Sequence, residues 1–203
     1  MFIYFDLGNV VAFFDRAQQC RQMGEVAGIS PERVHEVVLD GRLNERYERG
    51  ELSSGQFCEE FRRQTGSRVE DAPLLHAAAA IFRLNVSLIP VLGGLQDAGY
   101  RLGLLSNISP CHWEYLVGQN YWNLPGAFSV LALSYEMGAL KPEARIYDLA
   151  AEMAGAAPGD IFFCDDIMGH VTAARAAGFD AVQYTSTPAL VAELRGRGVR
   201  LNY

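Results

Sequence analysis

The feature that most constrains this sequence is an apolar run at its start that ends in a carboxylate. The run, Phe2-Ile3-Tyr4-Phe5, is β-prone, and it predicts a strand buried on both faces of a parallel sheet. Asp6 ends the run, and Gly8 follows two residues later. Open α/β sheets bind ligands at the carboxyl ends of their strands, so Asp6 is a candidate site residue. An Asp before Gly is also typical of a turn or cap, and this segment alone does not decide.

The rest of the chain has two patterns of predicted secondary structure. Residues 15 to about 85 show only helical patterns, with Ser30-Pro31 as a helix start, which predicts an inserted helical bundle. From Val86 onward strands and helices alternate, which predicts a parallel sheet with helices on both faces. The expected strands are Tyr100–Leu105, Phe128–Ala132, Ile161–Cys164 and Phe179–Gln183, and the expected helices are Pro90–Asp97, Glu114–Gln119, Glu143–Met153 and Thr172–Ala177.

Polar residues also follow two later stretches of the alternating region. Ser106 and Asn107 end the strand that starts at Tyr100, which is a common strand end and weak evidence by itself. Lys141 precedes Pro142, which is expected to open a helix and so to point the ammonium group at the strand ends. A lysine elsewhere on a surface is usually only solvated, but its spacing to a tyrosine six residues later favours a function here.

Two adjacent acids, Asp165 and Asp166, end the strand Ile161–Cys164. Like charges a few ångströms apart repel, so this pair is costly unless a lysine or a cation compensates it. Mg²⁺ suits such a site because it prefers oxygen ligands and keeps several waters. We therefore expect a magnesium site at this edge of the sheet.

Four segments resemble, in order and spacing, the motifs of the haloacid dehalogenase-like (HAD) hydrolases. They are Phe5-Asp6-Leu7-Gly8-Asn9-Val10, Leu104-Leu105-Ser106-Asn107, Leu140-Lys141-Pro142 through Tyr147, and Phe162-Phe163-Cys164-Asp165-Asp166. A fifth segment, Tyr47 to Ser53, is similar to one found in HAD members of subfamily I with a four-helix cap. The Asp-Leu-Gly-Asn-Val form also resembles a bacterial group that includes an α-D-glucose-1-phosphate phosphatase.

This resemblance covers nearly the whole chain and implies both a fold and an activity. The fold would be a Rossmann-like α/β core of residues 1–14 and 86–203, with a four-helix cap of residues 15–85 inserted after the first strand. The activity would be a two-step phosphatase reaction on a small phosphorylated metabolite, in which Asp6 forms an aspartyl-phosphate that water hydrolyses. Lys141 would hold Asp6 and, with Ser106 and Asn107, bind the phosphate.

The resemblance also implies how Mg²⁺ would be bound. Its ligands would be the Asp6 carboxylate, the backbone carbonyl of Gly8 and the Asp166 carboxylate, whereas Asp165 would contact the lysine or a water on the metal. His170 stands where many relatives have Asn or Asp, so the contact made at that position is left open. The cap would lie over the site, exclude water and select the substrate.

One position departs from the family pattern. Most HAD phosphatases have a second Asp, the general acid and base, where this chain has Gly8. General acid–base catalysis raises a reaction rate by roughly 10²–10⁴-fold. Three outcomes remain open: a substrate with an easier leaving group, such as a sugar 1-phosphate or an acyl phosphate; another proton donor; or a weak or retired enzyme. Besides water, the candidate donors in the helical insert are His35, Asp40, Glu45 and Glu48.

Two rival functions follow from the same departure. A 2-haloacid dehalogenase shares the nucleophilic Asp and uses no metal, but it has no need for the pair Asp165 and Asp166. A catalytically silent HAD-fold binding or regulatory protein would explain Gly8, but it has no need to retain Asp6 and Lys141. We therefore expect the phosphatase.

Composition limits the partners and the compartment. The 203 residues carry a net charge of −7 with no block of Lys or Arg, so nucleic acid and an anionic membrane are not expected as partners. No apolar run approaches the roughly 20 residues of a spanning helix. The start without a leader and the four widely spaced cysteines favour a cytoplasmic protein with reduced thiols over secretion or a zinc site. We expect a monomer or a homodimer.

Overall fold

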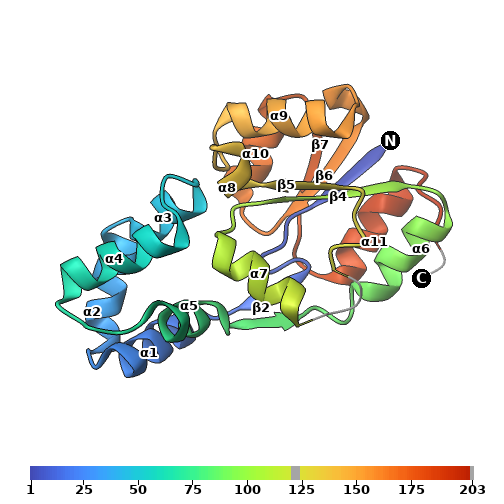
Figure 1. The fold of residues 1–203 in the computed structure, drawn as a ribbon. Helices are drawn as coiled ribbons and strands as arrows, with labels where there is room; N and C mark the ends of the chain where they lie inside the picture. Colours follow the sequence, from blue (N-terminus) through green and yellow to red (C-terminus); the bar gives the residue numbers. More distant parts are fainter. Residues whose placement is uncertain (120–123, 202–203) are drawn as a thin grey trace.

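A five-stranded parallel sheet forms the centre of the fold (Figure 1). The structure, a computed structural model, describes residues 1–119 and 124–201. The strand order is β5-β4-β1-β6-β7, with the bounds β1 Phe2–Phe5, β4 Arg101–Ser106, β5 Val130–Leu133, β6 Ile161–Asp165 and β7 Asp180–Gln183. The predicted α/β fold is thereby confirmed.

The side chains of β1 explain why this strand lies at the middle of the sheet. Successive residues of a strand point to opposite faces. Ile3 and Phe5 pack into the core on one face, under helices α6, α7 and α11, whereas Phe2 and Tyr4 pack on the other face, under α9 and α10. Because both faces of the sheet are covered by apolar side chains, polar side chains can reach a cavity only at the strand ends.

Two helices around the sheet begin earlier than the sequence predicts, and another helix was not predicted at all. Their bounds are α6 Ile89–Asp97, α7 Pro110–Gly118, α8 Ser134–Met137, α9 Ala144–Ala154, α10 Met168–Ala176 and α11 Thr187–Gly196, with a 3-10 turn at Pro158–Asp160. The expected starts at Glu114 and Thr172 were therefore four residues late, and α11 was missed. Pro142 does not open a helix, because it lies in a turn and α9 begins two residues later, at Ala144.

A second, helical layer lies between two short strands. Strands β2 Ala12–Phe14 and β3 Phe82–Leu84 pair antiparallel and bracket it. The helices are α1 Arg16–Ala27, α2 Pro31–His35, a π-helical stretch η1 Glu36–Asp40, α3 Leu43–Glu48, α4 Ser54–Thr65 and α5 Asp71–Ala79. The expectation of four helices and no strand was wrong: the segment has five α-helices, and β3 lies within the range expected to be helical.

Local signals explain where these helices start. Ser30 accepts a hydrogen bond from the backbone N–H of Arg33 and caps α2, as predicted. Ser53 and Gln56 form a reciprocal capping box at the start of α4. The apolar faces of the helices enclose a core of their own that includes Met23, Leu43, Tyr47, Phe57 and Phe61.

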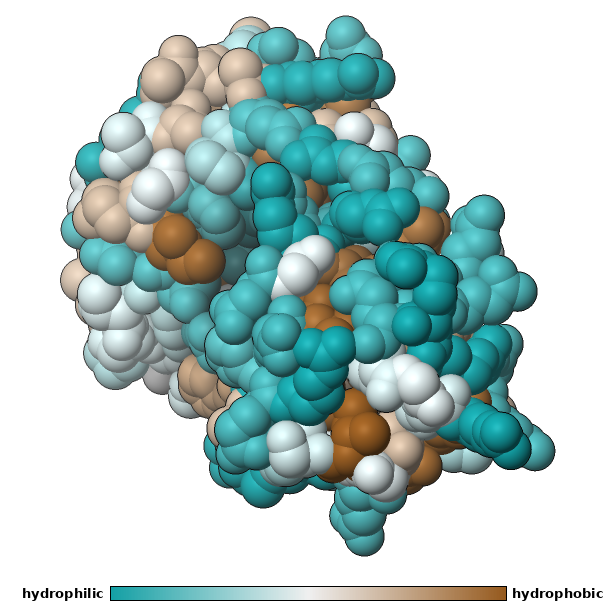
Figure 2. All heavy atoms as spheres, turned by 90° about the vertical axis from the view of Figure 1, so that its left-hand side faces the viewer, coloured by the Kyte–Doolittle hydropathy of each residue, from teal (hydrophilic) through white to brown (hydrophobic). Residues whose placement is uncertain are grey.

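The outer surface of the helical layer is mostly polar. Figure 2 views the molecule from this side and shows a largely hydrophilic surface with separate hydrophobic spots. Within residues 1–119 and 124–201, no helix combines the length and the apolar character that crossing a bilayer requires.

Candidate active site

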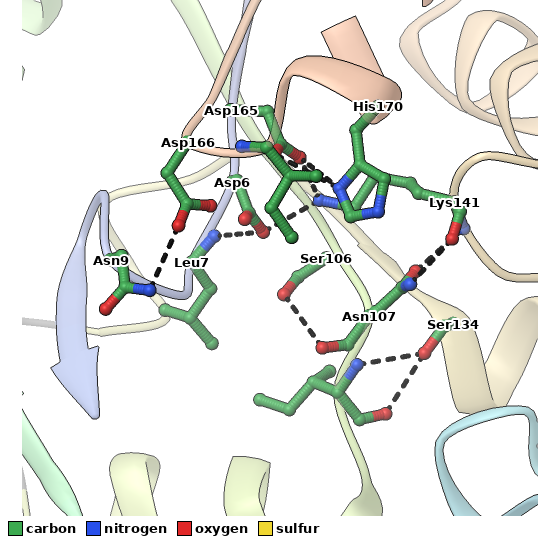
Figure 3. Close-up of polar contacts among 12 residues, drawn as sticks. Asp6, Leu7, Asn9, Ser106, Asn107, Ser134, Lys141, Asp165, Asp166 and His170 are labelled. Atoms are coloured by element: carbon green, nitrogen blue, oxygen red, sulfur yellow. Dashed lines mark hydrogen bonds and ion pairs between the residues drawn. The ribbon is translucent and has the colours of Figure 1, made fainter. Parts of the chain in front are cut away.

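The ends of the central strands bring the predicted acidic residues together. Asp6 follows β1, and Asp165 ends the neighbouring strand β6. Because β1 and β6 are parallel, their carboxyl ends meet at one edge, and the N–H of Asp6 donates to the carbonyl of Cys164 over 2.9 Å. Ser106 ends β4 on the other side of β1. Figure 3 shows these side chains converging on one space.

Lys141 joins the two strand ends. Its Nζ lies 2.9 Å from Oδ1 of Asp6 and 2.5 Å from Oδ2 of Asp165 (Figure 3). All three side chains are at most 8% exposed. Burial alone disfavours the ammonium, but the two carboxylates outweigh it and raise the pKa of Lys141. The lysine is therefore a fixed positive charge between two buried acids.

The loop that carries Lys141 is held by Asn107. The side-chain amide of Asn107 donates to the carbonyl of Lys141 over 2.9 Å, and its oxygen accepts from the N–H of Lys141 over 2.8 Å. This paired contact fixes the backbone at the base of the lysine side chain. Within residues 1–119 and 124–201, the hydroxyl of Ser106 makes only a long contact of 3.5 Å to the carbonyl of Asn107, so it is available for a ligand.

Asp165 is fully engaged with protein groups. Its Oδ1 accepts from the N–H of Ile167 over 2.8 Å, and Nδ1 of His170 lies 3.1 and 3.0 Å from its two oxygens. Burial by itself raises the pKa of Asp165, but Lys141 and His170 overcome it and lower the pKa to about 2. His170 thus makes the contact that the sequence left open.

The pKa of Asp6 is shifted in the opposite direction to that of Asp165. Burial is the largest effect on its carboxyl, and the nearby Asp165 and Asp166 add to it, so its pKa rises to about 6 although Lys141 opposes the shift. Its Oδ1 accepts a hydrogen bond of 2.7 Å from the N–H of Leu7. A buried carboxylate that is only partly compensated is a reactive group, and an additional cation would stabilise its charged form.

Three carboxylates near this point have the spacing of a metal site. One oxygen from each of Asp6, Asp165 and Asp166 lies within 4.8 Å of the others. Asp166 is partly exposed, and its Oδ2 accepts a hydrogen bond of 3.0 Å from Asn9. Lys141 supplies one positive charge against three carboxylates, so a divalent cation fits both the charge and the oxygen donors.

A cavity of about 230 Å³ opens above these residues. The strand-end residues Asp6, Gly8, Ser106, Asn107, Lys141, Asp166 and His170 line one half of it, together with Leu7, Asn9 and Ile167. The other half is lined by residues of the helical layer and its bracketing strands and by two residues of the β4–α7 region, namely Phe14, Arg16, Glu48, Ile81, Phe82, Ile108 and His112. The sequence pointed to none of this second set except Glu48, because these residues meet only through contacts between distant segments.

The position that lacks the usual second acid is closed by an aromatic ring. A Cβ atom added at Gly8 would lie 2.9 Å from Cε1 of Phe14, in β2. The guanidinium of Arg16 lies over the same ring, 5.0 Å from its centre. A side chain at Gly8 would therefore require Phe14 to move.

The four proton donors considered from the sequence lie in different places. His35 and Asp40 contact each other over 3.2 Å, are more than half exposed, and line a separate hollow beside α1. Glu45 pairs with Arg42 and lines a hollow next to the cavity, not the cavity itself. Glu48 alone among the four lines the cavity that contains Asp6.

Comparison with known protein families identifies this chain as a hydrolase. A family profile described as haloacid dehalogenase-like hydrolase matches residues 11–178. This range exceeds half of the chain, so the chain belongs to the haloacid dehalogenase-like hydrolases.

Individual relatives are more distant. The chain is similar to a D-ribitol-5-phosphate phosphatase of Bacteroides thetaiotaomicron, with 23% identity over 89% of this chain and 90% of the relative. A solved HAD family enzyme from the same organism, in complex with magnesium and inorganic phosphate, shares 25% identity with a TM-score of 0.81, over 91% of this chain and 94% of that one. A HAD-like hydrolase of Porphyromonas gingivalis shares 25% identity with a TM-score of 0.84, over 95% and 97%.

Proposed function

We propose that the chain is a Mg²⁺-dependent phosphomonoester hydrolase that works through an aspartyl-phosphate on Asp6. The observation that carries this proposal is the buried lysine bridge: Lys141 Nζ lies between Asp6 and Asp165, at the base of a cavity that Asp166 also lines. An anionic nucleophile must approach an anionic phosphate, and such a site provides the positive charge that this approach needs. The similarity to a phosphatase and to a magnesium and phosphate complex supports the same conclusion.

The chain's own residues would divide the work as follows. Asp6 attacks phosphorus, and Lys141 keeps its carboxylate oriented and neutralises charge on the phosphate oxygens. The Ser106 hydroxyl and the Asn107 segment would bind those oxygens, since both residues line the cavity beside Asp6. In the second step, water attacks phosphorus, the bond to Asp6 breaks, and phosphate leaves.

The metal would be held by the carboxylates of Asp6 and Asp166 and by the backbone carbonyl of Gly8, which lines the same cavity. When bound, Mg²⁺ supplies the charge that brings the nucleophile and the phosphate together. Both oxygens of Asp165 are already engaged by Lys141, Ile167 and His170, which supports a role in positioning the lysine and not in holding the metal directly.

We propose that residues 15–85 act as a cap over a core of residues 1–14 and 86–203. Several polar contacts hold the helical layer against the sheet domain, among them His112 Nε2 with the carbonyl of Ala78. Arg49 donates to both oxygens of Glu143 over 3.0 and 2.6 Å, and the Ser134 hydroxyl donates to the carbonyl of Glu48 over 2.6 Å. The Tyr47 hydroxyl accepts from the N–H of Cys111 over 3.2 Å. A cap held in this way would exclude water from the phosphate.

The substrate we propose is a small phosphorylated sugar or polyol. A cavity of about 230 Å³ admits only a small metabolite. Its far half combines apolar rings with the charged groups of Arg16 and Glu48, a mixture that suits a compound with several hydroxyl groups. The group that includes an α-D-glucose-1-phosphate phosphatase makes a sugar 1-phosphate one candidate, and the curated relative makes a pentitol 5-phosphate another.

Phosphate release from a panel of sugar 1-phosphates, polyol phosphates, acyl phosphates and nucleoside phosphates tests the proposal. We expect turnover with Mg²⁺ and none after EDTA treatment, with recovery when Mg²⁺ is added back. Release of chloride from 2-chloropropionate without phosphate release would instead identify a dehalogenase. Release of neither product would leave a binding or regulatory protein.

A further inference from the structure

The cavity contains one acid that the proposed phosphatase chemistry has not used. Breaking the bond between phosphorus and an alkyl oxygen leaves an alkoxide unless a proton reaches that oxygen. The position that usually holds the donor is Gly8, and Phe14 closes the space above it. A donor must therefore come from another residue of the cavity, if this chain hydrolyses alkyl phosphates.

The direction of the reaction restricts where that donor can lie. In an in-line displacement the leaving oxygen is on the side of phosphorus opposite to the attacking oxygen. Asp6 attacks from the strand ends, so the leaving oxygen faces the helical layer. Arg16 and Glu48 are the charged residues of that layer among the described residues that line the cavity.

Glu48 is anchored close to the phosphate-binding loop. It is the last residue of α3, and its carbonyl accepts from the hydroxyl of Ser134 over 2.6 Å. The same hydroxyl oxygen accepts from the N–H of Ile108 over 2.9 Å, one residue after Asn107. Glu48 also lines both the active-site cavity and the hollow next to it, and Asn107 and Lys141 line the same two cavities.

The side chain of Glu48 is held in one orientation. Its Oε1 accepts from Asn44 over 2.7 Å and from Arg16 over 3.2 Å, and only 12% of the side chain is exposed. Burial is the largest effect on its carboxyl and raises the pKa of Glu48, although Arg16 and Asn44 oppose the shift. The group thus holds a proton at higher pH than an exposed glutamate, and after losing it the carboxylate still has two donors.

The other titratable or cationic side chains of the cavity fit this role less well. The guanidinium of Arg16 is already engaged, because it donates to Glu48 and lies over the ring of Phe14. Burial lowers the pKa of His112 to about 3, so its ring is neutral, and Nε2 lies 3.2 Å from the carbonyl oxygen of Ala78. His170 contacts Asp165 on the strand-end side, the same side as the nucleophile.

We propose that Glu48 is the general acid and base of this enzyme, an inference that rests on the proposed phosphatase function. As the bond from Asp6 to phosphorus forms, the bond from phosphorus to the leaving oxygen breaks and its electron pair goes to that oxygen. The proton of the Glu48 carboxyl moves to the same oxygen, so a neutral alcohol departs. The Glu48 carboxylate then takes a proton from the water that attacks the aspartyl-phosphate, and the acid is regenerated.

If Glu48 donates the proton, the direction in which turnover changes with pH follows. The first step needs protonated Glu48, so turnover of an alkyl phosphate falls as pH rises through the pKa of this residue. The charged groups around Glu48 are Arg16 of α1, Glu45 of its own helix, the adjacent Arg49, and Lys141 and Glu143 across the hollow. Arg16 lowers the pKa of Glu48, and Glu45 raises it.

The test compares two leaving groups in the full-length enzyme with Mg²⁺. The leaving group of D-ribitol 5-phosphate is ribitol, which would depart as an alkoxide without a proton, whereas p-nitrophenyl phosphate releases p-nitrophenolate, a stable anion that needs none. We expect Glu48→Gln to lower kcat for the first by about 10²–10⁴-fold and to remove the alkaline fall of its pH profile. For the second we expect less than about a tenfold loss, by the same reasoning. Glu59→Gln, an exposed position of α4 that lines neither the cavity nor the hollow next to it, is the matched control and leaves both rates unchanged.

Two outcomes would overturn the assignment. Equal losses on both substrates in Glu48→Gln would show a structural role, and an unchanged rate with D-ribitol 5-phosphate would show that another group donates the proton. Failure of the phosphatase proposal itself is distinct, because the wild-type enzyme would then release phosphate from neither substrate.

Discussion

The two halves of the cavity are built in different ways. At the strand ends, Asp6, Lys141 and Asp165 form one continuous set of ion pairs, and all three are almost fully buried. On the helical side, Arg16 is one-third exposed and Glu48 is its partner over 3.2 Å, beside the rings of Phe14 and Phe82. The first half holds the nucleophile and its cation in buried ion pairs, whereas the second half contacts the leaving-group side of the substrate, where Glu48 is proposed to act.

This difference has a physical origin. Parallel strands must end at a common edge, so any chain that forms this sheet brings its strand-end residues together. The helical half depends on how a separate layer docks on the sheet, and the contacts of Arg49 with Glu143 and of Ser134 with Glu48 are part of that docking. Substitutions at the strand ends should therefore lower turnover of every substrate, whereas those on the helical side should act selectively, as expected for Glu48→Gln on alkyl phosphates.

The largest effect is expected from Asp6→Asn. Removing the nucleophilic carboxylate should lower phosphate release by at least about 10³-fold, because covalent catalysis has no substitute in the cavity. Phosphate release under saturating substrate measures this loss. Asp148→Asn, on the exposed side of α9, is the control and should keep full activity. Near-normal activity in Asp6→Asn would contradict the covalent route.

A loss of both activity and stability is expected from Lys141→Met. This change leaves Asp6 and Asp165 buried without the cation that lies 2.9 and 2.5 Å from them. Breaking a buried pair by removing one partner costs about 3–5 kcal/mol, so urea unfolding should show a decrease of this size in the free energy of unfolding. An unchanged midpoint would mean that the ion pairs do not couple the strand ends as described.

His112 of α7, which contacts the helical layer at Ala78, should make the fold sensitive to acid. Its pKa is about 3 in the folded chain against 6.5 for an unperturbed histidine, because burial excludes the charged form. Stability from this residue is complete above pH 6.5 and is lost as pH falls towards 3. Over that range His112 should reduce the free energy of unfolding by about 1.4 kcal/mol per pH unit.

Urea unfolding of the wild type and of His112→Gln, measured from pH 7 to pH 4, tests whether His112 causes the loss of stability in acid. Glutamine can still donate to the carbonyl of Ala78 but does not titrate, so its stability should fall less steeply with acid. Parallel curves for the two proteins would show that His112 does not cause the sensitivity.

The smallest effect is expected at the junction between the two halves. Gly8→Ala places a methyl group 2.9 Å from Cε1 of Phe14, and such overpacking costs about 1–3 kcal/mol. The double variant with Phe14→Leu should recover most of this loss in thermal unfolding. Gly93→Ala is the control, because no atom lies within 4 Å of an added Cβ there. A Gly8→Ala variant as stable as the wild type would show that Phe14 does not close this space.

The sequence predicted the strand-end half of the cavity well. An apolar run followed by Asp6, and a later run followed by Asp165 and Asp166, are local patterns, and the topology of a parallel sheet brings such ends together. Ser106 lies at the same edge for the same reason, whereas Lys141 reaches that edge from the turn before α9. The contact between His170 and Asp165 needed the structure, because a helix start can orient its side chains in several ways.

The helical half could not be predicted to the same extent. Phe14 and Phe82 reach the cavity through the antiparallel pair β2 and β3, which the sequence did not reveal, since each strand is only three residues long. Arg16 and His112 are far apart in the chain and have no local signature. Glu48 was one of four candidates, and only the docking of α3 on the sheet domain distinguishes it from Glu45.

The most direct test of the covalent mechanism is to trap the phosphorylated enzyme. Wild-type protein is mixed with Mg²⁺ and its best substrate, quenched in acid within one turnover, and digested for mass spectrometry. The proposed mechanism predicts a phosphoryl group on the peptide that contains Asp6, present in the wild type and absent from Asp6→Asn. Rapid phosphate release with no phosphorylated Asp6 peptide, or with the phosphoryl group on another residue, would contradict it.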